Sequence, residues 1–211
     1  MTATLESFAA ILKDQTSDLH TRAERHEIQR ALVTGRIGRD GYRAYLGQML
    51  HIHAALERAL RAAAAAGGPL ASLVRDYHFR EEQIRADLAF LGEGEVEALP
   101  ATAAFASWIG DKACPASLIG VLYVLEGSTN GGRYIARALR KSLALESGGT
   151  AFLDPHGEAQ AERWTRFKTD LDSLGLSEQE RAAALAAAQR TFEAIIAVND
   201  DLGAAAPALA G

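Results

Sequence analysis

Apolar residues recur at three- and four-residue intervals along almost the whole of this 211-residue chain. In the opening segment they include Phe8, Leu12, Leu19 and Ala23, which share one stripe of a helix expected to end before Gly35. The strict apolar–polar alternation of a half-buried strand is not found. The chain is therefore expected to fold from helices alone.

Glycine, proline and capping residues divide this pattern into segments. The apolar run at 118–125 could equally be a buried strand, but no partner strand is found, so a helix is preferred. We predict an all-α fold of about seven or eight helices in one domain over 1–211, with a frayed tail at 203–211. The first expected helix ends at residue 34, and the second, capped by Asp40, ends at 66. Further helices are expected at about 70–91, around 105–108, from Pro115 to about 143 and around 164–174. The last helix begins at a capping box of Ser177 and Glu180 and ends at about 202.

The charge and the single cysteine exclude several classes of protein. With 22 basic and 27 acidic residues the formal charge is −5, which disfavours a general nucleic-acid binder. Cys114 alone cannot form an internal disulfide and fits a reducing compartment, so a cytoplasmic location is expected. No secretory signal is evident, and the apolar stretch 113–125 is shorter than the ~20 residues of a membrane span. No membrane partner is expected.

Three glycines interrupt the helical pattern between residues 124 and 135. Inside a helix, Gly127, Gly131 and Gly132 would each cost about 1 kcal/mol relative to alanine. One explanation is that bare main chain approaches a flat ligand. The other is that Gly127 ends a helix, Ser128 caps the next, and Asn130 with Gly131 forms a turn. Spacing alone leaves both explanations open.

Two motifs carry a resemblance to a known family. The segment 122–139, with Leu-Glu-Gly-Ser followed by Gly-Gly, resembles the kinked distal helix of bacterial heme oxygenases. The run Asp18-Leu19-His20-Thr21-Arg22-Ala23-Glu24 resembles the proximal segment, in which a histidine binds the haem iron. The similarity extends from about Leu12 to Leu202. It implies a heme-oxygenase-like fold, His20 as iron ligand, and haem b as both cofactor and substrate, opened to biliverdin with release of CO and ferrous iron.

The residues around His20 fit this reading, although a boundary histidine without a special role is the plainer alternative. On one helix, Lys13 and Glu24 would share an edge with His20. Glu24 could accept the proton on Nδ1, and Lys13, ~10 Å along the helix, could pair with a haem propionate. The resemblance adds Lys168 as a second propionate contact, and Phe192 is expected in the core or the pocket wall.

The supply of protons is the point at which the chain departs from the animal-type members of the family. They carry an aspartate directly after the first glycine of the motif, where this chain has Ser128. We expect Ser128, Thr129 and Asn130 to anchor the ordered water that delivers a proton to bound O₂. Without that water the protein would be a non-catalytic haem carrier or sensor.

The reaction needs electrons, and the chain has no flavin or nicotinamide motif. A basic helical face could dock an acidic redox donor such as ferredoxin or a reductase, and it could equally be an ordinary solvated surface. The residues of this face are Arg133, Arg137, Arg140 and Lys141.

Two further functions remain as alternatives. A non-haem diiron oxidase would need His and Glu ligands on several helices, and the pairs His53–Glu57 and His78 with Glu81 and Glu82 have helical spacing. The Glu-x-x-His repeats of ferritin-like sites are missing, and His51 and His53 point to separate faces. A purely structural helical protein would leave His20 and the glycines unexplained.

Overall fold

A computed structural model describes residues 7–205. These residues form α-helices, two 3-10 helices and connecting loops, and no strand, so the all-α prediction is confirmed. The elements are α1 (Phe8–Gln15), α2 (Ser17–Arg25), α3 (Glu27–Thr34), α4 (Arg39–Ala65), α5 (Pro69–Leu73), η1 (Asp76–His78), α6 (Glu81–Leu91), α7 (Pro100–Asp111), α8 (Pro115–Gly127), α9 (Thr129–Ser142), η2 (Gly157–Ala159), α10 (Gln160–Asp172) and α11 (Glu178–Ala205).

The prediction of seven or eight helices was wrong, because three expected segments are broken. The first is divided at Thr16 and His26, the third between residues 74 and 80, and the fifth at Ser128. At each break a side chain forms a hydrogen bond to the backbone of a neighbouring turn. The Thr16 hydroxyl donates to the Leu12 carbonyl at 2.7 Å, and His26 Nδ1 accepts the N–H of Ile28 at 3.2 Å.

The helix ends agree with the predictions only in part. Ser177 and Glu180 form the expected capping box, with Glu180 accepting the N–H of Ser177 at 2.8 Å. Asp40 lies in the first turn of α4, and Gly38 occupies the capping position instead. α11 continues through Ala205, while 206–211 lie outside the described residues, so the frayed tail stays a prediction. Alanine favours the helix here, and the buried Leu202 anchors it. The domain limits of 1–211 stay a prediction.

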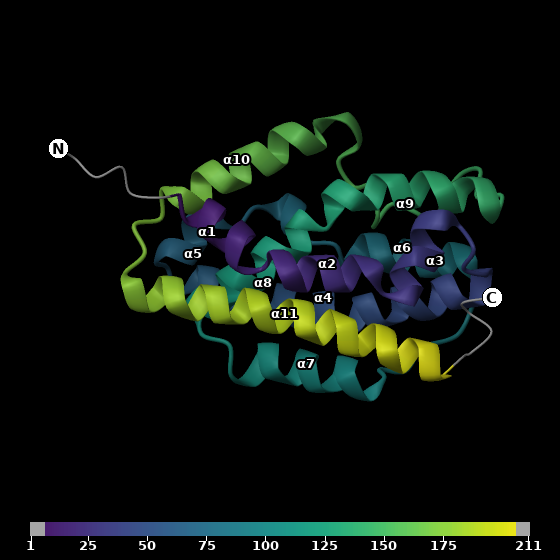
Figure 1. The fold of residues 1–211 in the computed structure, drawn as a ribbon, viewed down its shortest axis with the longest axis horizontal. Helices are drawn as coiled ribbons and strands as arrows, with labels where there is room; N and C mark the ends of the chain where they lie inside the picture. The colour runs from purple at the N-terminus through teal and green to yellow at the C-terminus, as the bar shows by residue number, and fades with distance from the viewer. Residues whose placement is uncertain (1–6, 206–211) are drawn as a thin grey trace.

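The longest helix, α11, packs closely along α8 in the centre of the molecule (Figure 1). A side chain at Gly120 of α8 would clash with the carbonyl of Ala184. Ala184, Ala187 and Ala188 of α11 are all buried at this contact. Small residues on both helices therefore let the two backbones approach.

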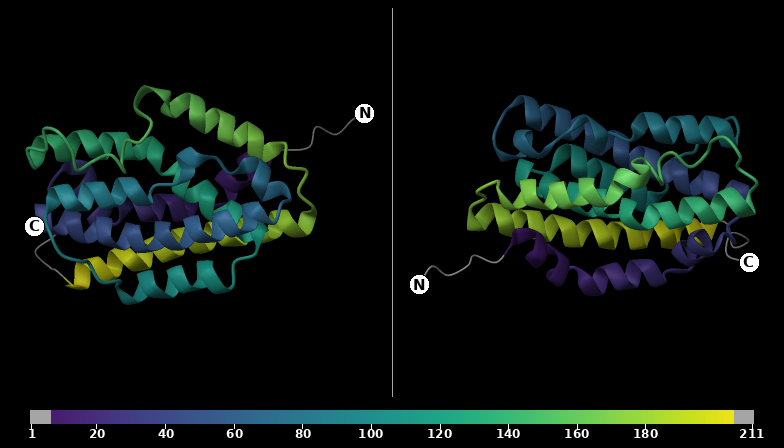
Figure 2. Two further views of the ribbon diagram at one scale, coloured as in Figure 1. Left: turned by 180° about the vertical axis from the view of Figure 1, so that it is seen from behind. Right: turned by 90° about the horizontal axis from the view of Figure 1, so that it is seen from above.

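The remaining helices cover this pair from several sides. α7 lies along one edge of the molecule, and α9 and α10 lie along the opposite edge (Figure 1). α1, α2 and α3 form a broken row that follows α11, as the right view of Figure 2 shows. The row and the α8–α9 pair thus face one another. Among the helices of residues 7–205, none combines the length and the apolar character that a membrane span requires.

Candidate functional site

A cavity of about 1400 Å³ lies between the row α1–α3 and the α8–α9 pair. It exceeds the roughly 300–1,000 Å³ of ordinary small-molecule sites. α4 and α11 contribute apolar side chains to it, among them Met49 and Phe192, and α10 closes one side with Trp164 and Lys168. The space is large and mostly apolar, as a bulky planar ligand needs.

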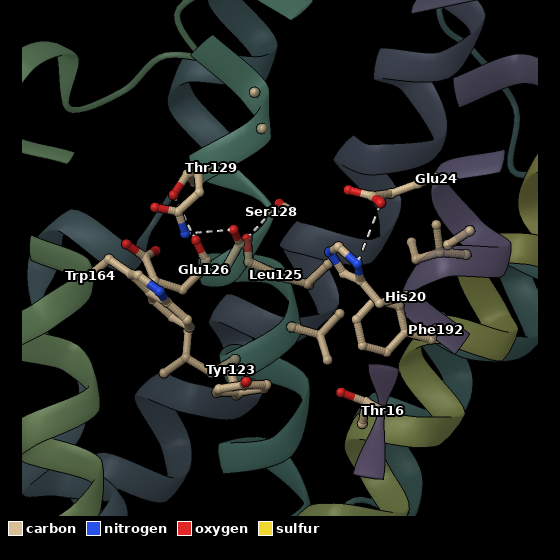
Figure 3. A pocket seen from close by; sticks show the side chains of 18 of the residues that line it. Thr16, His20, Glu24, Tyr123, Leu125, Glu126, Ser128, Thr129, Trp164 and Phe192 are labelled. Atoms are coloured by element: carbon tan, nitrogen blue, oxygen red, sulfur yellow. Dashed lines mark hydrogen bonds and ion pairs between the residues drawn. The ribbon is translucent and has the colours of Figure 1, made fainter. Parts of the chain in front are cut away.

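His20 reaches this cavity from α2. Its side chain is 55% exposed, so one ring nitrogen is accessible to a ligand. Nδ1 lies 3.6 Å from Glu24 Oε2, and the ring meets Phe192 edge to face with centroids 5.6 Å apart. Figure 3 shows the imidazole between Glu24 and Leu125 of α8, facing the broken helix. Glu24 and Phe192 therefore set the orientation of the ring from two sides.

Lys13 and Lys168 both line the cavity, although the helix expected to join Lys13 to His20 is interrupted at Thr16. Lys13 and His20 therefore lie on two helices, α1 and α2, and not on one continuous helix, while the separation of ~10 Å along the chain stays a prediction. Asp172, at the end of α10, accepts the Ser7 hydroxyl at 2.6 Å and the N–H of Ala9 at 2.9 Å. This contact ties together the helices that carry the two lysines.

The three glycines of the motif have different surroundings. A Cβ at Gly132 would clash with the carbonyl of Leu153, so this glycine has a packing role in the fold. A Cβ at Gly127 would lie 3.3 Å from the Trp164 ring, whereas one at Gly131 would meet nothing within 4 Å. Gly131 thus lines the cavity without any packing reason to be glycine.

The polar residues of the motif satisfy the helix break itself. The side chains of Ser128, Thr129 and Asn130 each donate to a carbonyl three residues earlier, at 2.7, 2.6 and 2.9 Å respectively. Gln160, which is buried, donates to Thr129 at 2.6 Å and to Asn130 at 3.2 Å. The three residues therefore hold the end of α8 and the start of α9 in place.

A buried polar cluster beside them was missed by the sequence reasoning. Arg80 Nη2 donates to Glu126 Oε2 at 2.6 Å, and His156 Nε2 lies 3.2 Å from Glu126 Oε1. Burial alone would raise the pKa of Glu126, but the hydrogen bond from His156 and the charge of Arg80 outweigh it and lower that pKa. The members come from distant parts of the chain, so no local spacing signals them.

Several nitrogens of this region lack hydrogen bonds. His53 Nδ1, His78 Nε2 and both Nε and Nη1 of Arg80 are buried without a partner in residues 7–205. All three side chains line the cavity. Unpaired buried polar atoms at a cavity wall are typical binding points for ordered water.

The two buried histidines predict acid sensitivity. Burial lowers the pKa of His53 to about 3 and that of His78 to about 4, against about 6.5 in an unfolded chain. Below pH 6.5 the unfolded state therefore binds more protons than the folded state. We expect the free energy of unfolding to fall by about 1.4 kcal/mol per pH unit for each histidine until the folded pKa is reached.

Urea titrations from pH 8 to 4 measure this dependence. His53→Leu should reduce the slope of the free energy of unfolding against pH, below pH 6, by about 1.4 kcal/mol per pH unit. Above pH 7 the substitution should leave that slope unchanged. An unchanged slope would mean that His53 is not buried as a neutral side chain.

Glu57, one of the carboxylates expected for a diiron site, has structural partners instead. Glu57 accepts the backbone N–H groups of Arg80 and Glu81 at the start of α6 and pairs with Arg61 at 3.2 Å. Across residues 7–205 no group of three or more His, Cys, Asp or Glu side chains is placed to hold a metal ion. The diiron alternative has no support in this geometry.

The basic residues of α9 are divided between solvent and structure. Arg137 and Lys141 are exposed and Arg133 is half-buried. Arg140 donates to Thr150 at 2.9 Å and lies 3.8 Å from Asp154, so it also supports the following loop.

Within the all-helical part of the chain that the structure describes, an accessible imidazole lies across a large, mostly apolar cavity from a glycine-broken helix, which is the arrangement of a binding site for a bulky ligand. A family model described as heme oxygenase matches residues 6–201 of the chain. The chain therefore belongs to the heme oxygenase family, which makes it an enzyme that acts on haem.

Individual relatives are distant. The chain is 24% identical over 207 residues to human heme oxygenase 1, covering 93% of this chain and 72% of that protein. It is 37% identical over 123 residues to the heme oxygenase of Xanthomonas campestris pv. campestris, covering 55% of this chain and 64% of the relative.

Solved structures share the fold. The haem complex of heme oxygenase-1 from the cyanobacterium Synechocystis matches with a TM-score of 0.85 at 19% identity, over 94% of this chain and 93% of that one. The heme oxygenase of Leptospira interrogans matches with a TM-score of 0.84 at 23% identity, over 92% and 98% of the two chains.

Proposed function

We propose that this protein cleaves haem to biliverdin, CO and ferrous iron, using O₂ and electrons from a separate donor. The observation that carries the proposal is the cavity of about 1400 Å³ in which the accessible His20 faces the α8–α9 break. Haem would supply an iron that activates O₂ and a ring that is itself oxidised. The residues of the chain would bind it, orient it and supply protons.

Binding is assigned to both sides of the cavity. Nε2 of His20 would coordinate the iron, while Glu24, 3.6 Å from Nδ1, would favour the tautomer with the proton on Nδ1. Lys13 and Lys168 would pair with the two propionates. On the opposite side, the main chain at Gly127 and Gly131 would lie along the ring plane, and Gly132 keeps the backbone there by packing on Leu153.

Proton supply is assigned to water held at the buried polar cluster. Arg80, His53 and His78 turn unpaired nitrogens to this region, whereas the hydroxyls of Ser128 and Thr129 already donate to carbonyls. Both hydroxyl oxygens can still accept a hydrogen bond from water. We therefore propose that Ser128, Thr129 and Asn130 fix the helix break and bound water, and that water held by the unpaired nitrogens of Arg80, His53 and His78 relays the proton from solvent.

Electrons would enter from an acidic partner such as a ferredoxin or a reductase. The proposed docking face on α9 consists of the half-buried Arg133 and the exposed Arg137, Arg140 and Lys141. A location in the cytoplasm remains an expectation based on the single cysteine.

The decisive experiment adds hemin to the purified protein and then a ferredoxin reducing system in air. We expect a Soret band on binding, followed by its loss and the appearance of biliverdin absorption and CO. A stable haem complex that survives reduction would favour the carrier or sensor. That second function is favoured by one observation, the engagement of the polar side chains of the motif by backbone carbonyls.

The substitution Gly131→Ala separates a ligand role of the motif from a structural one. Because a Cβ there meets nothing within 4 Å, the haem-free protein should be stabilised by up to about 1 kcal/mol. The methyl group would obstruct a macrocycle lying on the main chain, so haem affinity should fall about tenfold, which is about 1.4 kcal/mol.

Chemical unfolding and hemin titration measure the two effects. Gly110→Ala is the matched control, because a Cβ at Gly110 of α7 also meets nothing within 4 Å and this position lies outside the cavity. It should leave haem affinity unchanged. Wild-type affinity in Gly131→Ala would remove this residue from the proposed site.

A further inference from the structure

The loop between α9 and η2 shapes the cavity without belonging to either helix. It spans the 14 residues between Ser142 and Gly157. Irregular connections of this length are uncommon in compact domains unless they serve a function. Phe152 and Leu153 of this loop line the cavity, and both are buried.

A buried carboxylate on α6 holds the loop. Asp87 is 2% exposed and accepts the N–H of Ala151 at 3.0 Å and that of Phe152 at 2.8 Å, one on each oxygen. Burial raises its pKa, and these N–H groups act against that effect. Hydrogen bonds to a carboxylate are about twice as strong as neutral ones, so Asp87 is the main tether.

A second tether holds the preceding turn. The Tyr42 hydroxyl of α4 donates to the Gly149 carbonyl at 2.8 Å and is buried. Asp87 and Tyr42 therefore hold consecutive parts of the loop from two helices that pack against each other.

The held loop places an aromatic ring against a cavity histidine. The Phe152 ring meets the His53 imidazole edge to face, with centroids 5.2 Å apart. Nδ1 of His53 has no hydrogen-bond partner, so no hydrogen bond at that nitrogen orients the ring. The contact with Phe152 orients it instead. A change at Asp87 reaches His53 through Phe152.

We propose that Asp87 is a positioning residue of the cavity, which fixes the 149–152 turn so that Phe152 orients the imidazole of His53. The inference deepens the proposed function and rests on it for one step, the use of His53 at bound haem. Asp87 itself does not line the cavity and touches no substrate.

The haem-free protein tests the positioning directly. Asp87→Asn keeps the shape of the side chain, but its NH₂ group opposes one of the two N–H donors. NMR should show a shifted His53 ring-proton signal, because the ring current of Phe152 moves, and amide exchange of Ala151 and Phe152 faster by about tenfold or more. Asp40→Asn, at an exposed carboxylate of α4, is the matched control and should change neither.

The haem complex tests the consequence. We expect Asp87→Asn to lower turnover about tenfold with haem affinity changed less than about twofold, as for other residues that orient a functional group through a neighbour. A lower melting temperature with wild-type His53 signal and turnover would overturn the proposal. If Asp87→Asn does not fold, Tyr42→Phe decides: a His53 shift in the same direction is expected, and an unchanged signal overturns it.

The two proposals fail in different ways. If the wild-type protein does not degrade haem, the proposed function fails while the NMR shift in Asp87→Asn still stands. If wild-type turnover is normal and Asp87→Asn behaves like Asp40→Asn in every measurement, only the positioning role fails.

Discussion

Replacing His20 by alanine should abolish haem degradation, which makes it the substitution with the largest expected effect on activity. His20 is 55% exposed in the cavity, and the Glu24 carboxylate 3.6 Å from Nδ1 leaves Nε2 as the nitrogen for iron. Loss of residues that merely support a ligand costs about 10–100-fold in affinity or activity. Loss of the ligand itself should exceed that, so we expect turnover to fall by more than about 100-fold.

Absorption spectra and turnover measure the result. Because the alanine leaves room beside Phe192, added imidazole should restore the wild-type Soret spectrum and part of the activity. His51→Ala is the matched control. This histidine of α4 does not line the cavity, and its Nε2 lies 2.7 Å from the Val96 carbonyl oxygen. A wild-type spectrum in His20→Ala would assign the iron to another residue.

The largest expected effect on stability comes from Gly120→Ala at the contact of α8 with α11. Alanine in a helix would ordinarily gain about 1 kcal/mol over glycine. Here its Cβ would clash with the Ala184 carbonyl, a backbone atom that no rotamer change can move. We expect a net loss of about 2–3 kcal/mol, typical of overpacking against a rigid neighbour.

Thermal unfolding gives the corresponding readout. For a chain of this size the loss amounts to a decrease in Tm of about 5–10 °C. Gly110→Ala should raise the Tm slightly, since open space surrounds that position. Equal Tm values for Gly120→Ala and the wild type would mean that α8 and α11 are further apart than described.

Much of the fold could be predicted because its signals are local. Apolar stripes, the capping box at Ser177 and breakers such as Gly35 act within one or two turns of a helix. The helix breaks at Thr16 and His26 could not be predicted from the sequence. Each depends on a side chain that forms a hydrogen bond to the backbone and not to solvent. These two breaks account for part of the difference in helix number, and the breaks at 74–80 and at Ser128 account for the rest.

Some residues of the candidate site could likewise be predicted from local sequence, and others could not. His20 and the glycines belong to contiguous motifs, so their positions follow from the order of residues. The buried polar cluster joins Arg80, Glu126 and His156, which are far apart in the chain. These groups come into contact only through packing of the helices, and the spacing of the residues in the sequence does not indicate it.

The amino-acid sequence by itself determined a helical chain, the histidine on its opening segment and the glycine interruption in its middle, because hydrogen bonding and periodicity within a helix are properties of neighbouring residues. The tertiary structure alone decided which glycine faces open space, which polar groups are buried unpaired, and that Asp87 holds the loop beside His53. These features depend on burial, and burial exists only once distant helices have packed together.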